Sequence, residues 1–149
     1  MALMSPMMNT TFETIIDDFA FLDDWDDRYK YVIDLGKQLP EFPDEARTEE
    51  NRVRGCASQV WMLHKFEGQG PQATLSLQAD SDAHIVRGLV AILLTLFQGK
   101  TITQIDALDA QAALAPLDLA DHLTPQRTNG LGAMIETIKK SAARENTLA

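Results

Sequence analysis

Hydrophobic positions near the N-terminus recur with the spacing of an α-helix. The first stretch places four apolar residues on one helical face: Phe12, Ile15, Ile16 and Phe19. Thr10 and Glu13, three residues apart, fit a capping box at its start. A second stretch, from Asp23 to Leu39 and followed by Pro40, predicts another helix. Its buried side comprises Trp25, Tyr29, Val32, Ile33 and Gly36, so the two stretches predict a helical hairpin.

The pattern changes to the two-residue period of β-strands in the middle of the chain. Residues 59–67 are rich in strand-forming residues and end in a turn cluster, 68–71. Residues 73–80 then alternate, which predicts a buried face (Ala73, Leu75, Leu77, Ala79) and a solvated face (Thr74, Ser76, Gln78, Asp80). The two segments predict an antiparallel hairpin with one wet face. Ahead of it, residues 40–58 have no period and predict a long loop with a short edge strand near Arg52.

The C-terminal half returns to helical spacing. Ser81 can cap a helix that runs to about Phe97, and its apolar residues leave a narrow stripe of His84, Arg87, Ala91, Thr95 and Gln98. A helix this apolar is predicted at the centre of the domain. Residues 102–119 predict short helical pieces broken at Pro116. A last helix from Pro125 buries Leu131, Met134, Ile135, Ile138 and Ala142.

These elements predict an α+β fold in which a small antiparallel sheet packs against helices. The length of 149 residues suits one domain, which we place at residues 10–145 after a flexible N-terminus, 1–9. Thirteen Lys and Arg against twenty-two Asp and Glu give a net charge of −9, which disfavours nucleic-acid and anionic-membrane partners. The longest apolar stretch, Gly88 to Phe97, has ten residues, whereas a membrane-spanning helix needs about 20. With no recognisable signal peptide, we expect a cytoplasmic protein.

Cys56 is the main candidate for chemistry, and it is the only cysteine. It excludes an internal disulfide and any metal site built from several thiolates of one chain. Its neighbours Gly55, Ala57 and Ser58 are small, which would let the thiol approach another protein closely. Arg52 and Arg54 lie nearby, and positive charge favours the thiolate. A structural, inert cysteine remains the alternative.

Other candidate residues favour a structural interpretation. His64, His84 and His122 lie far apart with no ligand spacing, and no glycine-rich phosphate loop precedes a helix. The acidic run from Asp17 to Asp27 is typical of helix capping and a solvated face. In the last helix, Thr124 can cap and Arg127 projects near the start. The two glycines at 130 and 132 each cost about 1 kcal/mol relative to alanine, which indicates close backbone packing or a ligand surface.

One motif resembles a known family. Residues 54–61, Arg-Gly-Cys-Ala-Ser-Gln-Val-Trp, are similar to the G-C-x-S-x-V-W signature of the SufE family of sulfur acceptors, which includes the CsdE proteins. Further similarity lies in 31–40, in 80–89 and in 122–131, so the resemblance covers about residues 12–143. Gln126 stands where the family usually has a serine.

The resemblance implies a protein that takes sulfane sulfur from a cysteine desulfurase as a persulfide on Cys56. It would stimulate that SufS- or CsdA-like desulfurase and pass the sulfur to an iron–sulfur scaffold complex. Pyridoxal phosphate would belong to the desulfurase, so no cofactor or metal is expected on this chain, which would be a monomer or weak homodimer. The implied fold is of the SufE/IscU type. The 40–58 loop would extend Cys56 into the partner. In the free protein, Val60, Trp61 and the central helix would cover the thiol.

Two alternatives stay open beside this one. A stand-alone, peroxidase-like thiol enzyme would need a histidine or second cysteine in the motif, and neither is present there. A non-catalytic binding module would leave Cys56 with a structural role. The sequence also leaves open whether Arg52, Arg54 and Arg127 assist the thiolate or only dock the partner.

Overall fold

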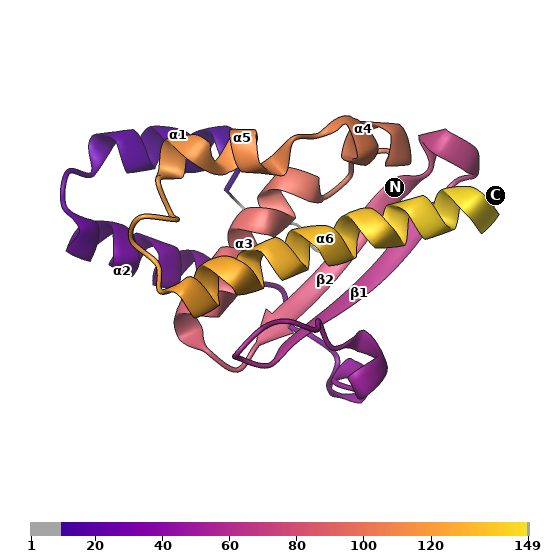
Figure 1. Ribbon diagram of the computed structural model, residues 1–149, viewed down its shortest axis with the longest axis horizontal. Helices are drawn as coiled ribbons and strands as arrows, with labels where there is room; N and C mark the ends of the chain where they lie inside the picture. The colour runs from indigo at the N-terminus through magenta and orange to yellow at the C-terminus, as the bar shows by residue number, and fades with distance from the viewer. Residues whose placement is uncertain (1–9, 149) are drawn as a thin grey trace.

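The computed structural model describes residues 10–148, and the segment expected to be flexible, 1–9, lies outside them. Within this range, helices pack against a two-stranded antiparallel sheet, which confirms the predicted α+β class (Figure 1). The main elements in chain order are α1 (Phe12–Phe21), α2 (Trp25–Gly36), β1 (Val60–Glu67), β2 (Thr74–Ser81), α3 (His84–Phe97), α4 (Ile102–Ala107), α5 (Ala110–Leu114) and α6 (Pro125–Leu148).

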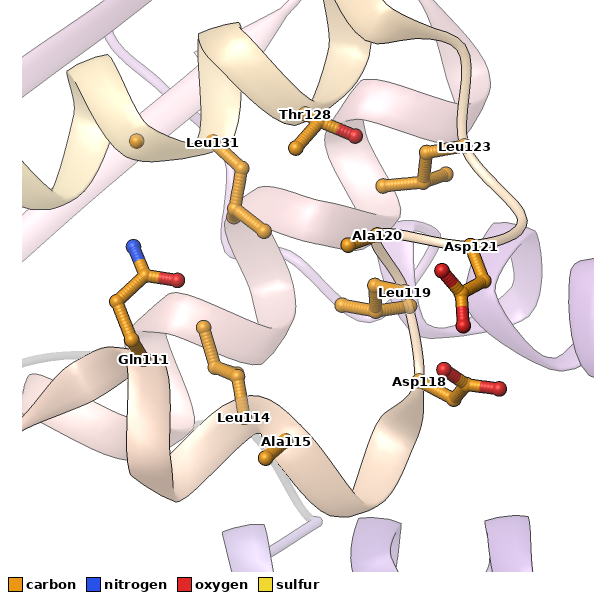
Figure 2. Close-up of a pocket in the computed structure, with 11 residues that line it drawn as sticks. Gln111, Leu114, Ala115, Asp118, Leu119, Ala120, Asp121, Leu123, Thr128 and Leu131 are labelled. Atoms are coloured by element: carbon orange, nitrogen blue, oxygen red, sulfur yellow. The ribbon is translucent and has the colours of Figure 1, made fainter.

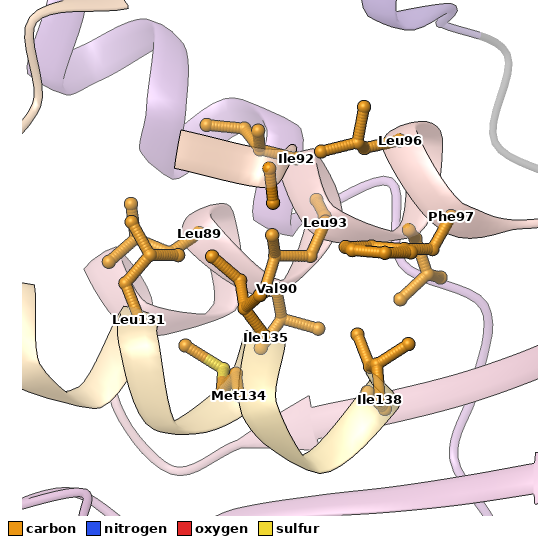
Figure 3. Packing of buried hydrophobic residues seen from close by; sticks show 14 of the residues in the cluster. Leu89, Val90, Ile92, Leu93, Leu96, Phe97, Leu131, Met134, Ile135 and Ile138 are labelled. Atoms are coloured by element: carbon orange, nitrogen blue, oxygen red, sulfur yellow. The ribbon is translucent and has the colours of Figure 1, made fainter. Parts of the chain in front are cut away.

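The helix α3 lies at the centre of the core, as its apolar pattern predicts. Eleven of its fourteen residues are buried, including Ala91, which the sequence placed in the narrow stripe outside the apolar rows. Figure 3 shows its apolar side chains facing those of α6, among them Leu131, Met134, Ile135 and Ile138. All the residues that the last helix was predicted to bury are buried. Each such aliphatic side chain contributes roughly 1.5–3 kcal/mol through burial.

The helices α1 and α2 begin at caps one residue away from the predicted positions. Thr11, not Thr10, caps α1, because its Oγ1 accepts from the Thr14 N–H at 3.2 Å. The capping box at Thr10 and Glu13 is therefore wrong, and the Thr10 hydroxyl instead donates to Gln38 Oε1. Asp24 caps α2, which confirms a capping role within the acidic run.

The crossing of α2 over α3 depends on two glycines, Gly36 and Gly88. A Cβ at Gly88 would lie 2.1 Å from the carbonyl oxygen of Val32, and one at Gly36 would lie 2.8 Å from the Gly88 nitrogen. Both distances are far below carbon contact distances, so the two backbones touch. This contact fixes α3 under the helical hairpin.

The buried and solvated faces of the sheet are as predicted, with one exception. β1 pairs antiparallel with β2, from Val60 opposite Ser81 to Glu67 opposite Thr74. The four residues predicted to be buried, Ala73, Leu75, Leu77 and Ala79, are buried. Asp80, predicted on the wet face, is 8% exposed. Ser81 belongs to β2 and does not cap α3, whose N-cap is Ala83.

The two edges of the sheet differ. The side-chain amide of Gln98 pairs with both backbone groups of Leu77, accepting from its N–H at 2.6 Å and donating to its C=O at 2.9 Å. Both backbone groups of Leu75 are paired as well, here with backbone groups: its N–H donates to the Lys100 carbonyl, and its carbonyl accepts from the Gly99 N–H. On β1, segment 51–53 pairs with the start of the strand, and beyond it the outward backbone groups of His64 and Phe66 have no hydrogen-bond partner within residues 10–148.

The segment 40–58 is more ordered than its sequence predicts. It contains two 3₁₀ turns, Asp44–Ala46 and Glu49–Asn51, and buries Phe42 and Ala46. The edge strand expected near Arg52 is reduced to an isolated bridge with Trp61. Buried apolar side chains therefore hold most of this segment to the domain.

Residues 102–119 form short pieces, as predicted. A 3₁₀ turn, Ala115–Leu117, contains Pro116 and follows α5 directly. In the part of the chain that the structure describes, we find no helix long and apolar enough to cross a membrane.

Candidate functional site

Cys56 lies at the tip of a closed loop. The loop is closed at its base, where the Val53 N–H donates to the Val60 carbonyl at 2.8 Å. Gln59 is fixed beside it, since its N–H donates to Asp82 Oδ1 and its carbonyl accepts from the Ser81 hydroxyl at 2.7 Å. Gly55 has a φ of +89°, a conformation that favours glycine and turns the chain toward α6.

The thiol of Cys56 rests against the N-terminal half of α6. Its Sγ–H donates to the carbonyl oxygen of Gly130 at 3.5 Å, and a Cβ at Gly130 would lie 3.4 Å from the Sγ. The close backbone packing predicted for this glycine is confirmed. Beside the sulfur lies a small cavity of about 20 Å³, lined by Cys56, Ala57, Ser58, Val86, Leu89, Gln126, Arg127, Gly130 and Met134.

The cover over the thiol comes from α3 and α6. Val86 and Leu89 supply it from α3, the central helix that was expected to do so, and Met134 supplies it from α6. Val60 and Trp61, which were also expected to cover the thiol, do not line this cavity. Trp61 instead lies under the guanidinium of Arg47, 5.4 Å from the ring centre.

The electrostatics of Cys56 favour the neutral thiol in this position. Burial raises the pKa of the Cys56 thiol, and the positive charge of Arg52 lowers that pKa by a smaller amount. Arg52 also forms an ion pair with Glu49 at 3.2 Å. Arg54 is largely exposed and lies 3.9 Å from the same carboxylate. The arginines therefore do not make Cys56 a reactive thiolate while the loop rests on α6.

Arg127 is brought to the rim of the cavity by the start of α6. Thr124 caps this helix as predicted, with its Oγ1 accepting from the Arg127 N–H at 3.3 Å. Arg127 and Gln126 are exposed and border the cavity that contains the Cys56 sulfur. The structure thus joins two segments, the cysteine loop and the start of α6, that are 74 residues apart in the chain.

A partly buried ionic cluster anchors the segment that leads to the loop, and sequence analysis missed it. Asp80 Oδ2 accepts from Arg47 Nη1 at 2.6 Å, and Asp80 Oδ1 lies 3.1 Å from Arg87 Nε. Arg47 also lies over the ring of Phe42. The alternation in β2 predicted a solvated Asp80, and its partner Arg47 lies 33 residues earlier in the chain, so the sequence near Asp80 does not indicate this contact.

The three histidines take up separate structural positions. His64 is half-buried with its Nε2 enclosed and unpartnered, and burial lowers its pKa to about 4. His122 stacks on Trp25 with ring centres 3.9 Å apart, and His84 is exposed. Among residues 10–148, no group of three or more His, Cys, Asp and Glu side chains is placed to hold a metal ion.

Another cavity beside α6 does not contain the cysteine. Figure 2 shows it between α5 and α6, with Leu114, Leu119 and Leu131 on its walls and Asp118 and Asp121 at one side. Its volume is about 340 Å³. Gly132 lines this cavity, whereas Gly130 lines the small one beside Cys56. The two glycines therefore serve different faces of α6.

Comparison with known proteins assigns the chain to a family. The SufE Fe-S metabolism associated domain matches residues 13–142. This chain belongs to the SufE family. An uncharacterised SufE-like protein from Rhizobium meliloti (strain 1021) is 53% identical over 133 residues, 89% of this chain and 95% of its own length. Another from Rhizobium etli is 52% identical over 132 residues, 89% of each chain.

The fold of this SufE-family chain is also found in a solved structure. A solution structure of a hypothetical protein from Thermus thermophilus superposes with a TM-score of 0.71, covering 91% of this chain and 96% of that one. The sequence identity is 17%, so this similarity concerns the fold alone. SufE membership thus establishes a domain associated with Fe-S metabolism. In this domain the structure places the cysteine loop against α6.

Proposed function

We propose that this protein accepts sulfane sulfur from a cysteine desulfurase as a persulfide on Cys56. Removing the sulfur stimulates the desulfurase, and the sulfur then passes to an iron–sulfur cluster assembly scaffold. The observation that carries the proposal is the position of the Cys56 sulfur, at a loop tip and beside a cavity of about 20 Å³. SufE family membership supports a desulfurase as the donor.

The transfer step needs one thiolate and one donor persulfide. The Cys56 thiolate attacks the outer sulfur of the donor, a new S–S bond forms to Sγ, and the bond between the two donor sulfurs breaks. The electron pair of that bond leaves with the donor cysteine as a thiolate. No oxidant or reductant is consumed, and the Cys56 proton goes to a base of the partner or to water.

The tip of the loop is held weakly enough to move toward a donor. Within the described residues, Arg54–Ser58 makes one side-chain hydrogen bond to the rest of the domain, from Cys56 Sγ to Gly130, and one exposed ion pair, between Arg54 and Glu49 at 3.9 Å. The base on either side is fixed by Val53, Gln59 and their backbone partners. Movement of the short tip on its fixed base would take the thiol out of its apolar cover. Outside that cover the pKa of the Cys56 thiol is lower, which favours the nucleophilic thiolate. The whole 40–58 loop does not need to move.

The proposal predicts that Cys56 alone carries sulfur. After incubation with a desulfurase, pyridoxal phosphate and cysteine, the intact protein should gain the mass of one sulfur atom, which a reductant removes. The Cys56→Ser variant should gain none, because serine oxygen does not form a persulfide. Mass spectrometry measures both, with Cys56→Ser shown to be folded by circular dichroism.

Three outcomes separate the alternatives. Sulfur retained by Cys56→Ser would contradict the proposal. Peroxide consumption by the wild type without any desulfurase would instead favour a stand-alone thiol enzyme. Full stimulation of the desulfurase by Cys56→Ser would favour a binding module.

A further inference from the structure

We propose that Gly130 is a positioning residue for the persulfide, and that its missing side chain reserves the space that the second sulfur occupies beside Cys56. The inference rests on the proposed function, since it concerns the persulfide of that same cysteine. It adds a residue outside the cysteine loop whose size decides whether the carried sulfur is enclosed.

The geometry around Gly130 points to a reserved space. Gly130 lies inside α6, where glycine is destabilising relative to alanine. A Cβ there would lie 3.4 Å from Cys56 Sγ and 3.8 Å from both Cys56 Cα and Cys56 Cβ. These are ordinary contact distances, so a methyl group could sit against the thiol without displacing it.

The second sulfur of a persulfide changes this balance. It lies about 2.05 Å beyond Sγ and needs room of its own. The cavity bordered by Cys56 and Gly130 has about 20 Å³, little more than the roughly 10–15 Å³ that one water-sized atom requires. A methyl group on residue 130 would lie against Sγ and take up space beside this cavity. The thiol and the methyl group therefore fit together, whereas the outer sulfur of the persulfide and the methyl group compete for the same space.

Gly132 provides a matched control on the same helix. It is two residues further along α6, and a Cβ there would meet nothing within 4 Å. It lines the cavity between α5 and α6 and not the one beside Cys56. Alanine at either position raises helix propensity equally, so a difference between the two variants reports contact with Cys56 and not the stability of the helix.

The test loads the persulfide chemically, without a desulfurase. Inorganic tetrasulfide donates sulfur when the Cys56 thiolate attacks it, forming a persulfide and releasing trisulfide. Cyanide then removes the outer sulfur as thiocyanate and regenerates the thiolate. The rate of thiocyanate release measures exposure of the persulfide, and alkylation by iodoacetamide measures exposure of the unloaded thiol. Both rates are compared for wild type, Gly130→Ala and Gly132→Ala.

We expect Gly130→Ala to release thiocyanate about tenfold faster than wild type, while its thiol alkylation stays within about threefold. Gly132→Ala should match wild type in both rates. A general loosening of the loop would raise both rates of Gly130→Ala together, and that result would overturn the proposal. So would equal thiocyanate release by the two alanine variants, or a wild type that retains no sulfur. A protein that passes this test but takes no sulfur from a desulfurase would contradict the proposed function alone.

Discussion

Residues 42–53 and the tip Arg54–Ser58 are neighbours in the chain, but they are attached to the domain in different ways. We call residues 42–53 and the β1–β2 sheet the frame. Residues 42–53 bury Phe42, Ala46 and Val53 and are joined to β2 through the Arg47–Asp80 ion pair. The tip rests on α6 through the Cys56 sulfur and a small apolar cavity.

The difference separates stability from chemistry. Buried charge and aromatic contacts in the frame resist movement, because removing one partner leaves another uncompensated. The tip gives up only one weak hydrogen bond and a small apolar contact when it leaves α6, so a partner that offers modest contacts can expose the thiol. Both regions hold a titratable group in its neutral form by burial, His64 in the frame and Cys56 in the tip.

The largest effect should appear in the frame at acid pH. Burial lowers the pKa of His64 from 6.5 to about 4, so between these values the unfolded chain binds a proton that the folded chain does not. Stability is therefore fully present above pH 6.5 and is lost as pH falls toward 4, by up to about 3 kcal/mol. Over the same pH range, the free energy of unfolding of the His64→Leu variant should fall less than that of the wild type, by up to this amount.

Urea denaturation across a pH series measures the effect of His64. His84→Gln is the control, since His84 is exposed and its replacement should leave the acid loss unchanged. A pH dependence of His64→Leu parallel to that of wild type would show that His64 takes up a proton without cost in the folded chain.

A smaller effect should distinguish frame from tip directly. Asp80→Ala leaves Arg47 and Arg87 without their shared carboxylate and should cost about 2 kcal/mol, because the partners are only partly buried. Cys56→Ala removes one weak hydrogen bond and one half-buried sulfur and should cost under about 1 kcal/mol. Equal losses in chemical denaturation would mean that the tip is as structural as the frame, and the comparison would fail.

The smallest effect concerns the pKa of Cys56. Arg52 lowers that pKa, so Arg52→Ala should raise it further and reduce the thiolate fraction near neutral pH by about two- to threefold. Arg54→Ala is the matched control, because Arg54 is exposed and sits 3.9 Å from Glu49. The pH profile of iodoacetamide alkylation gives both values. A larger shift in Arg54→Ala than in Arg52→Ala would reverse the roles of the two arginines.

Sequence patterns predicted what local spacing determines. The alternation in β2 predicted the buried face correctly, and the stripe of α6 predicted its core residues together with the Thr124 cap. Cys56 stood out by its motif and Gly130 by its place inside a helix. Each of these signals lies within a few residues of the feature that it predicts.

The errors arise where distant segments meet. Asp80 is buried by Arg47, 33 residues before it, so the alternation of β2 could not show it. The contact of Cys56 with Gly130 spans 74 residues. The burial of Cys56 outweighs the charge of Arg52, so the pKa of the thiol is raised where the arginines alone would lower it. Thr11 and not Thr10 caps α1, and the Thr10 hydroxyl instead donates to Gln38, 28 residues away.

The amide of Gln98 has a consequence for association between copies of this chain. An exposed strand edge is a template on which another chain can add a strand, and repeated addition leads to fibres. By pairing with Leu77, Gln98 removes that template from β2. Within the described residues, the unpaired backbone of β1 is left as the edge for such addition. Two copies joined there would have no second open edge of this kind, so growth would stop at a pair instead of continuing as a fibre.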